Sequence, residues 1–437
     1  MSKKQTISLA AAVMININIM LGAGVFLNTV KLSPAGALGS LAYLIAGAMM
    51  LPLVLTIAKL TGMHPSGGFY AFGKNELHPF AGFISAWSYF IGKLASGALM
   101  IHFSLSLIQQ LIGLGSVPIL VLDAIAIGAF ISLNMLNVKA GSRIQVTFTF
   151  LKLIPIIFAI LTGLYLFQGS NVTAVHRVWS EIPPLLPLLF YATMGFEAAC
   201  LLCNKIENAQ RNAPRAILIS YGITLTIVAI YQLVFYGALG TMLTNLVSFN
   251  ASYLYPFPAL LQKLLPASPA LAVKIKSILH LALASSALGG AYGIMFSNTW
   301  NLHTLAKNNH LFFSNVFTWL NRHAIPVACV FVEGAIYATY LLVSSGTQIV
   351  LQQLSSLGVV LAYTMSVIAL MAAKIKRPNI PVSILLPVFG LISCTVFIGT
   401  SISGLIKAGL PSLLTFSTLL ILGALMFVAT GKKGKTC

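Results

Sequence analysis

Apolar runs of about 20 residues follow one another along almost the whole chain, separated by short polar segments. A helical run of this length matches the hydrocarbon thickness of a bilayer. The pattern predicts an all-α polytopic membrane protein, because a transmembrane β-barrel would show alternating segments of about ten residues instead. Twelve transmembrane helices are expected, at about residues 7–30, 37–61, 82–112, 118–138, 144–168, 184–204, 214–241, 273–304, 325–345, 348–372, 380–404 and 411–430.

Glycine interrupts the first of these spans. Gly22, Ala23 and Gly24 lie near its middle, and each glycine costs a helix interior about 1 kcal/mol relative to alanine. Unwound backbone at this depth is tolerated only where it is buried in protein or lines a cavity. Two alternatives follow. The freed N–H and C=O groups could bind the carboxylate and ammonium of a zwitterion, or the glycine pair could only let two helices pack closely.

The sixth span has an interruption of the same kind. Three prolines begin it, Gly195 interrupts it, and Glu197 lies within its apolar run. Interrupted helices at corresponding positions of two halves indicate a transporter site at the interface between two repeats. Because the two interruptions are five spans apart, the repeats are expected to have opposite orientations.

The composition agrees with a membrane protein, since 58% of the 437 residues are hydrophobic and only 7% are charged. The net charge of +19 is explained by the positive-inside rule rather than by binding of nucleic acid. Most of the 25 Lys and Arg residues lie in segments on the side of the N-terminus, which predicts cytoplasmic termini and contact with anionic lipids. The N-terminal apolar run is interpreted as a retained helix rather than a signal peptide. We therefore expect a multi-pass protein of the plasma or inner cell membrane.

The sequence offers no constellation typical of an enzyme or of a metal site. Cys200 and Cys203 form a CxxC pair inside an apolar helix, without a second pair or a nearby histidine. They are interpreted as small buried hydrophobic residues. No Ser/His/Asp set or pair of carboxylates has a usable spacing, so neither an enzymatic activity nor a cofactor is expected.

Three motifs, taken in order, resemble those of one transporter family. They are LGAGVF at Leu21–Phe26, HPSGGFYAFGKNELHPFAGFISAW at His64–Trp87 and GFEAACLLCNKIENAQRNAPRAI at Gly195–Ile217. Together they resemble the amino acid–polyamine–organocation superfamily of secondary transporters. The resemblance implies a single transporter domain over residues 1–437 with a five-plus-five inverted repeat of the LeuT type. The repeats would cover about residues 7–168 and 184–372, followed by two additional helices at 380–430.

The resemblance also implies how a substrate would bind at the two interruptions. The α-carboxylate would meet the amides of Gly22, Ala23 and Gly24, and the α-amino group would meet carbonyls near Ile19 and at Tyr191, Ala192 and Thr193. This agrees with the preference of half-helix N-termini for anions and of C-termini for cations. Tyr191 matches the family position of an aromatic residue that closes over the substrate, and an ordinary packing aromatic is the alternative.

Lys152, in the fifth span, is an ionisable residue at bilayer depth, where charge is costly and usually functional. It matches a lysine that some family members carry where sodium-coupled relatives hold a sodium ion. Its ammonium would reach the carbonyls of the broken first span, either as a proton carrier or as a fixed surrogate for sodium. A lysine that snorkels to the interface is the alternative.

Lys93, in the third span, has two alternative roles. If it faces the pocket, its charge would repel cationic substrates by on the order of several kcal/mol in a low dielectric, which favours neutral or acidic amino acids. If it pairs with Glu197 across the bundle, its role is structural. Glu197 is expected to support the unwound part of the sixth span through hydrogen bonds.

The eighth span departs from the family pattern. Trp300 stands where the family has an arginine, and Asn308 and Asn309 stand at its Asp-Gly position. A charge contact at the inner gate is therefore expected to be absent or rebuilt. Tyr292 and Phe296, in the same span, are expected on the pocket wall.

These observations predict a secondary amino acid transporter that works by alternating access. Proton symport or substrate exchange is expected rather than sodium coupling, with a neutral or acidic substrate. The alternatives are a cationic amino acid or polyamine antiporter, and an amino acid sensor that does not transport. The expected partners are a small amino acid, protons and anionic lipids, and the sequence leaves the oligomeric state open.

Overall fold

The computed structural model describes residues 6–136, 138–173, 180, 182–245 and 256–433. Within these residues the secondary structure is helical, apart from one isolated β-bridge between Ile7 and Ile206. The helices are α1 (Leu9–Met20), α2 (Ala23–Lys31), η1 (Ser33–Ala35), α3 (Leu38–Met63), α4 (Gly68–Glu76), α5 (Pro79–Leu111), α6 (Ile119–Asn134), α7 (Val138–Tyr165), α8 (Gly169–Thr173), η3 (Pro183–Leu185), α9 (Leu186–Thr193), α10 (Ala198–Leu201), η4 (Cys203–Lys205), α11 (Ala209–Leu239), α12 (Thr241–Asn245), α13 (Pro256–Leu264), α14 (Pro269–Lys307), α15 (Ser314–Thr318), α16 (Val327–Ser344), α17 (Gln348–Lys376), α18 (Leu385–Ala408) and α19 (Leu410–Lys433).

The predicted class, an all-helical polytopic membrane protein, is confirmed. In the described part of the chain, ten helical segments are long and apolar enough to cross a membrane. Twelve spans were expected from the apolar runs, and two of them are not among these ten segments. One corresponds to α6, which has 16 residues, and the other is divided between the short helices α9 and α10.

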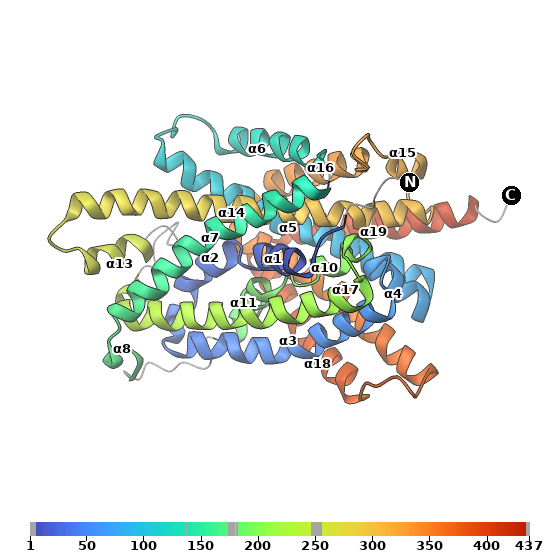
Figure 1. The fold of residues 1–437 in the computed structure, drawn as a ribbon, viewed down its shortest axis with the longest axis horizontal. Helices are drawn as coiled ribbons and strands as arrows, with labels where there is room; N and C mark the ends of the chain where they lie inside the picture. Colours follow the sequence, from blue (N-terminus) through green and yellow to red (C-terminus); the bar gives the residue numbers. More distant parts are fainter. Residues whose placement is uncertain (1–5, 137, 174–179, 181, 246–255, 434–437) are drawn as a thin grey trace.

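The long helices run side by side as a bundle (Figure 1). Helices α4 and α15 lie at one end of this bundle, where α19 also ends, and α8 and α13 lie at the opposite end (Figure 1). The β-bridge ties the chain before α1 to the segment after α10, because the Ile7 amide donates to the Lys205 carbonyl at 2.8 Å. The Glu207 amide donates to the Ile7 carbonyl at 3.0 Å.

Helix α5 is central to the packing, since it contacts α4, α14, α16, α17 and α19. A Cβ atom on Gly92 of α5 would lie 2.5 Å from the Cα of Gly358 of α17. Only glycine allows two helix backbones to approach so closely. Around this axis, α1 packs against α7, α11 and α14, and α9 packs against α2, α3 and α17. The two interrupted segments, residues 15–30 and 186–203, are therefore buried throughout.

Candidate functional site

The first helix is broken at Leu21 and Gly22. Helix α1 ends at Met20, Gly22 is extended with φ −91° and ψ −157°, and α2 begins at Ala23. The predicted glycine motif therefore straddles the break, because Gly24 already lies in the first turn of α2. The first N–H groups of a helix have no partner within that helix. The start of α2 thus presents backbone donors and a positive helix end in the interior of the bundle.

Lys152 of α7 occupies the carbonyl side of this break. Its Nζ donates to the carbonyl of Asn18 and, at 2.8 Å, to that of Leu21. The side chain is fully buried, and the negative end of α1 gives its ammonium a favourable place. The structure therefore has Lys152 at the first break, with its Nζ bound to backbone carbonyls.

The second break lies between α9 and α10. Helix α9 ends at Thr193, Met194 is extended, and Gly195 has φ +124°. Only glycine adopts this backbone conformation at little cost. A Cβ on Gly195 would also lie 3.0 Å from side-chain atoms of Ile19 and Met20. The sequence therefore needs glycine here both for the turn and for the close approach to α1.

The two breaks touch each other. Gly195 of the second break lies against Ile19 and Met20 at the end of α1, as its contacts indicate. Conversely, a Cβ on Gly24 would lie 2.7 Å from the ring of Tyr191 and 3.3 Å from the Cα of Ala192. Four helix ends, those of α1, α2, α9 and α10, thus meet within the bundle.

Glu197 stabilises the second break through four hydrogen bonds. Its Oε2 accepts from the Gly195 amide at 2.7 Å and from the Tyr363 hydroxyl at 2.8 Å. Its Oε1 accepts from the Tyr89 hydroxyl and from Lys93 Nζ, each at 3.0 Å. Of the two alternatives for Lys93, the structure contains the buried ion pair with Glu197. The carboxylate joins the break to α5 and α17.

Asn16 is an important residue of the site that the sequence analysis missed. Its Nδ2 donates to the Phe196 carbonyl at 2.6 Å and to Ser220 Oγ at 3.0 Å, while its Oδ1 accepts from the Ala199 amide at 3.0 Å. This one side chain connects α1, the second break and α11. The signal for it was an amide side chain within an apolar span, a residue type that is costly there unless it has partners.

The side chains of Tyr191 and Thr193 contact different parts of the bundle. The Tyr191 ring covers Gly24, and its hydroxyl lies 2.9 Å from Ser96 Oγ of α5. The Thr193 hydroxyl donates to the Leu189 carbonyl of its own helix at 2.9 Å and contacts Met50 Sδ at 2.7 Å. Tyr191 therefore lies at the first break, whereas the Thr193 side chain points to α3.

Tyr292 and Phe296 of α14 are not brought to the breaks. The Tyr292 ring packs against Phe130 of α6 at 5.9 Å between centroids, and Phe296 packs against Gly141 of α7. A different face of α14 meets α1, since a Cβ on Gly293 would lie 2.8 Å from Ile19 Cγ1. Residues one position apart on a helix point about 100° away from each other, which separates the two faces.

Charged and aromatic groups join several helices at the end of the bundle where α4 and α15 lie (Figure 1). Lys205 Nζ lies 4.1 Å from the centroid of the Trp300 ring, a cation–π contact at the position where the family has an arginine. Glu76 of α4 pairs with His64 Nε2 at 2.8 Å and with Arg377 at the end of α17. The charge contact at Trp300 was expected to be absent or rebuilt, and the structure has the Lys205–Trp300 contact there.

His310, just after α14, belongs to the same end of the bundle. It hydrogen-bonds the Tyr70 hydroxyl at 2.7 Å and contacts the ring of Phe427 at 4.7 Å between centroids. Burial, and to a lesser extent the nearby charge of Lys74, lower the pKa of His310 to about 4. Burial raises the pKa of Tyr70 to about 12. The pair is therefore neutral around pH 7.

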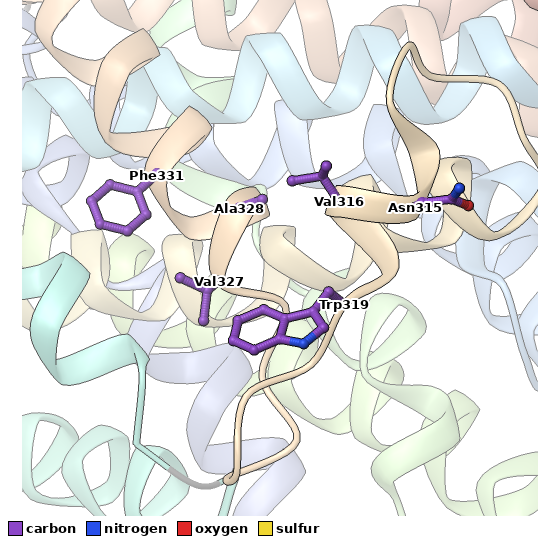
Figure 2. Close-up of a pocket in the computed structure, with 6 residues that line it drawn as sticks. All are labelled: Asn315, Val316, Trp319, Val327, Ala328 and Phe331. Atoms are coloured by element: carbon purple, nitrogen blue, oxygen red, sulfur yellow. The ribbon is translucent and has the colours of Figure 1, made fainter.

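A groove of about 540 Å³ lies between α15 and the start of α16, away from the breaks (Figure 2). It is lined by Asn315, Val316, Trp319, Val327, Ala328 and Phe331. Apart from the Asn315 amide and the Trp319 indole N–H its lining is apolar, and it contains no charged side chain to pair with a zwitterion. In the described residues, no group of three or more His, Cys, Asp or Glu side chains could hold a metal ion.

The sequence matches a family profile described as amino acid permease over residues 7–430. The chain belongs to the amino acid permease family. The resemblance drawn from the three motifs is thereby confirmed, and the permease is a multi-pass membrane protein with transporters as relatives.

Two of these relatives differ in how much of the permease they cover. An uncharacterized transporter of Mycobacterium tuberculosis is 25% identical over 417 residues, which is 90% of this chain and 85% of the relative. The serine/threonine exchanger SteT of Bacillus subtilis is 30% identical over 251 residues, or 55% of this chain and 56% of the exchanger. Both names describe transporters rather than enzymes.

Proposed function

We propose that this permease moves an amino acid across the cell membrane by alternating access, without a chemical step. The observation that carries the proposal is the direct contact between the two broken helices, Gly195 against Ile19 and Gly24 against Tyr191. Helix N-termini and C-termini of opposite partial charge meet there in the buried interior. A ligand that carries one positive and one negative group at a fixed separation is complementary to this arrangement.

In this proposal the α-carboxylate binds the N–H groups of Ala23 and Gly24 at the start of α2. The Gly22 N–H, which was expected to join them, donates to the Met20 carbonyl at 2.8 Å. The α-amino group binds carbonyls at the end of α1, near Ile19, and at the end of α9, from Tyr191 to Thr193. Charge-assisted hydrogen bonds of this kind are about twice as strong as neutral ones. Tyr191, which covers Gly24, would close over the bound amino acid.

Coupling would not use sodium at the first break. The ammonium of Lys152 already binds two carbonyls there, and a sodium ion would need those same oxygens. The place of Lys152 at these two carbonyls supports proton symport or substrate exchange rather than sodium coupling. The name of the Bacillus subtilis relative, a serine/threonine exchanger, supports exchange and a small neutral substrate.

The substrate would be neutral or acidic. Glu197, the carboxylate at the breaks, already accepts four hydrogen bonds and pairs with Lys93. A cationic amino acid or polyamine would have to displace Lys93 to reach it. The antiporter alternative is therefore less well supported than transport of a neutral or acidic amino acid.

The architecture would be the twelve-span, five-plus-five inverted repeat, with repeats at about residues 7–168 and 184–372. The broken helices, α3 and α11 would rock against α5, α6, α14 and α16. An even number of spans requires both chain ends on one side of the membrane. Both would be cytoplasmic by the charge bias.

Flux through reconstituted vesicles tests this proposal. Purified permease in proteoliposomes loaded with unlabelled serine should take up labelled serine or threonine faster than empty proteoliposomes do, if exchange is the mode. A proton gradient should instead drive uptake if symport is the mode. Binding of an amino acid without uptake in either condition would support the non-transporting sensor and contradict transport.

A further inference from the structure

One face of α5 contacts both breaks. Lys93 pairs with Glu197 at the second break. Ser96, about one helical turn further along α5, hydrogen-bonds the Tyr191 hydroxyl. Met100 follows Ser96 at the spacing of four residues that keeps side chains on one helix face. This third position lies at the first break, and it carries the only apolar side chain of the three.

The Met100 thioether lies between two backbones. A Cβ on Gly22 would lie 3.2 Å from Met100 Sδ and closer still to Cε, and a Cβ on Gly290 of α14 would lie 2.6 Å from Sδ. Glycine at both positions leaves room for the sulfur and its methyl group. Met100 is 2% exposed, so its side chain fills the space between the start of α2 and α14.

The same space adjoins the backbone donors proposed to bind the α-carboxylate, because Gly22 directly precedes Ala23 and Gly24. The side chain of a bound amino acid branches from the carbon next to that carboxylate. A methionine side chain is unbranched and flexible, so it can shift within a cavity, but its volume remains. A large substrate side chain would therefore compete with Met100 for room, whereas a small one would not.

We propose that Met100 is the specificity-determining residue that limits this permease to amino acids with small side chains. Alanine, serine and threonine fit beside it, and leucine and phenylalanine do not. The inference rests on the proposed function and adds to it the substrate class and the residue that sets it. Removal of the Sδ and Cε atoms should open the site to larger side chains.

Binding to the purified full-length permease tests this inference. Dissociation constants for alanine and leucine are measured by isothermal titration for the unmodified permease, Met100→Ala and Met100→Val. Met100→Val keeps more of the packing than alanine does, which guards against a variant that fails to fold. Met295→Ala is the matched control, because Met295 is also fully buried but is not among the atoms nearest to a Cβ on Gly22, Gly24 or Gly195.

We expect the unmodified permease to prefer alanine over leucine by at least about tenfold, the lower end of the discrimination that a single methylene group gives in an apolar pocket. Both Met100 variants should reduce this preference by about tenfold or more, and Met295→Ala should retain it. An unchanged preference in the Met100 variants, or equal affinity of the unmodified permease for both ligands, would overturn the size limit but not the proposed function. Failure of the unmodified permease to bind any amino acid would overturn both.

Discussion

The two breaks are stabilised by charges of opposite sign and by very different numbers of contacts. At the first break one cation, Lys152, binds the carbonyl end of α1, and Ser286 Oγ adds a longer hydrogen bond to the Leu21 carbonyl at 3.5 Å. At the second break a carboxylate, Glu197, accepts one backbone amide and three side-chain donors from α5 and α17. Asn16 adds a further bond to the amide of Ala199. The comparison indicates that one charged side chain carries most of the first break, whereas a network of hydrogen bonds from several helices holds the second.

The largest expected effect comes from removing the anion of the second break. Glu197→Ala leaves Lys93 as an unpaired buried charge, which should lower the free energy of unfolding by about 3–5 kcal/mol. The measurement is unfolding of the purified permease in mixed micelles by titration with SDS. Addition of Lys93→Met to this variant should recover part of the loss, because no unpaired charge then remains.

Glu333→Ala is the matched control for that experiment. Glu333 is also fully buried, but it forms no ion pair with a described residue. Its removal should therefore cost less than removal of Glu197. Equal losses from the two substitutions would mean that burial alone, and not the network, makes Glu197 important.

Removal of the cation at the first break should affect transport more than folding. Lys152→Gln can still donate hydrogen bonds but has no charge, so uptake into proteoliposomes should fall at least tenfold, about 1.4 kcal/mol for the loss of a charge-assisted bond. Lys263→Gln is the control, because Lys263 Nζ also donates to a helix-end carbonyl, that of Ala238 at 2.6 Å, but far from the breaks. Normal uptake by Lys152→Gln across pH 5–8 would refute the role proposed for Lys152.

Backbone strain at the second break gives a smaller effect. Gly195→Ala places a side chain at φ +124°, which should destabilise the permease by about 1–3 kcal/mol. Gly222→Ala lies within helix α11, where a Cβ would meet no atom within 4 Å, and should stabilise by about 1 kcal/mol or less. In SDS unfolding, Gly195→Ala should lower the free energy of unfolding and Gly222→Ala should raise it slightly. Equal effects of the two substitutions would contradict the geometry of this break.

A titrating group outside both breaks gives the smallest effect. His310 has a pKa of about 4 in the folded permease against about 6.5 in an unfolded chain. As the pH falls, His310 is therefore protonated in the unfolded chain at a higher pH than in the folded permease. The free energy of unfolding decreases as the pH falls from about 6.5 towards 4. The melting temperature should fall less over this range in His310→Phe, while His323→Phe on the exposed loop after α15 should behave like the unmodified permease.

The sequence predicted the features that depend on local pattern. The apolar runs gave the helical membrane class, Gly22 and Gly195 marked breaks within one or two residues of their observed places, and Lys152 was expected at the carbonyls of the first span. Each of these follows from helix propensity, helix length or the cost of charge in a membrane. Such arguments need no knowledge of which helices are neighbours.

What the sequence could not predict depends on how each helix is rotated against its neighbours. Tyr292 and Phe296 were expected at the pocket, yet they face α6 and α7, since a rotation of about 100° exchanges one face of a helix for the next. The partners of Glu197 on α17, 166 residues away at Tyr363, are likewise set by packing. Met100 had no signal at all, because a methionine in an apolar span is indistinguishable from a core residue.

The central claim, that the two breaks together recognise both charges of an amino acid, is tested most directly by ligand binding. Thermal stabilisation of the purified permease is measured with L-serine, with ethanolamine, which lacks the carboxylate, and with N-acetyl-L-serine, which lacks the ammonium. A ligand that binds the folded state raises the apparent melting temperature. The account predicts stabilisation by serine and none by either analogue, and equal stabilisation by serine and one of the analogues would contradict it.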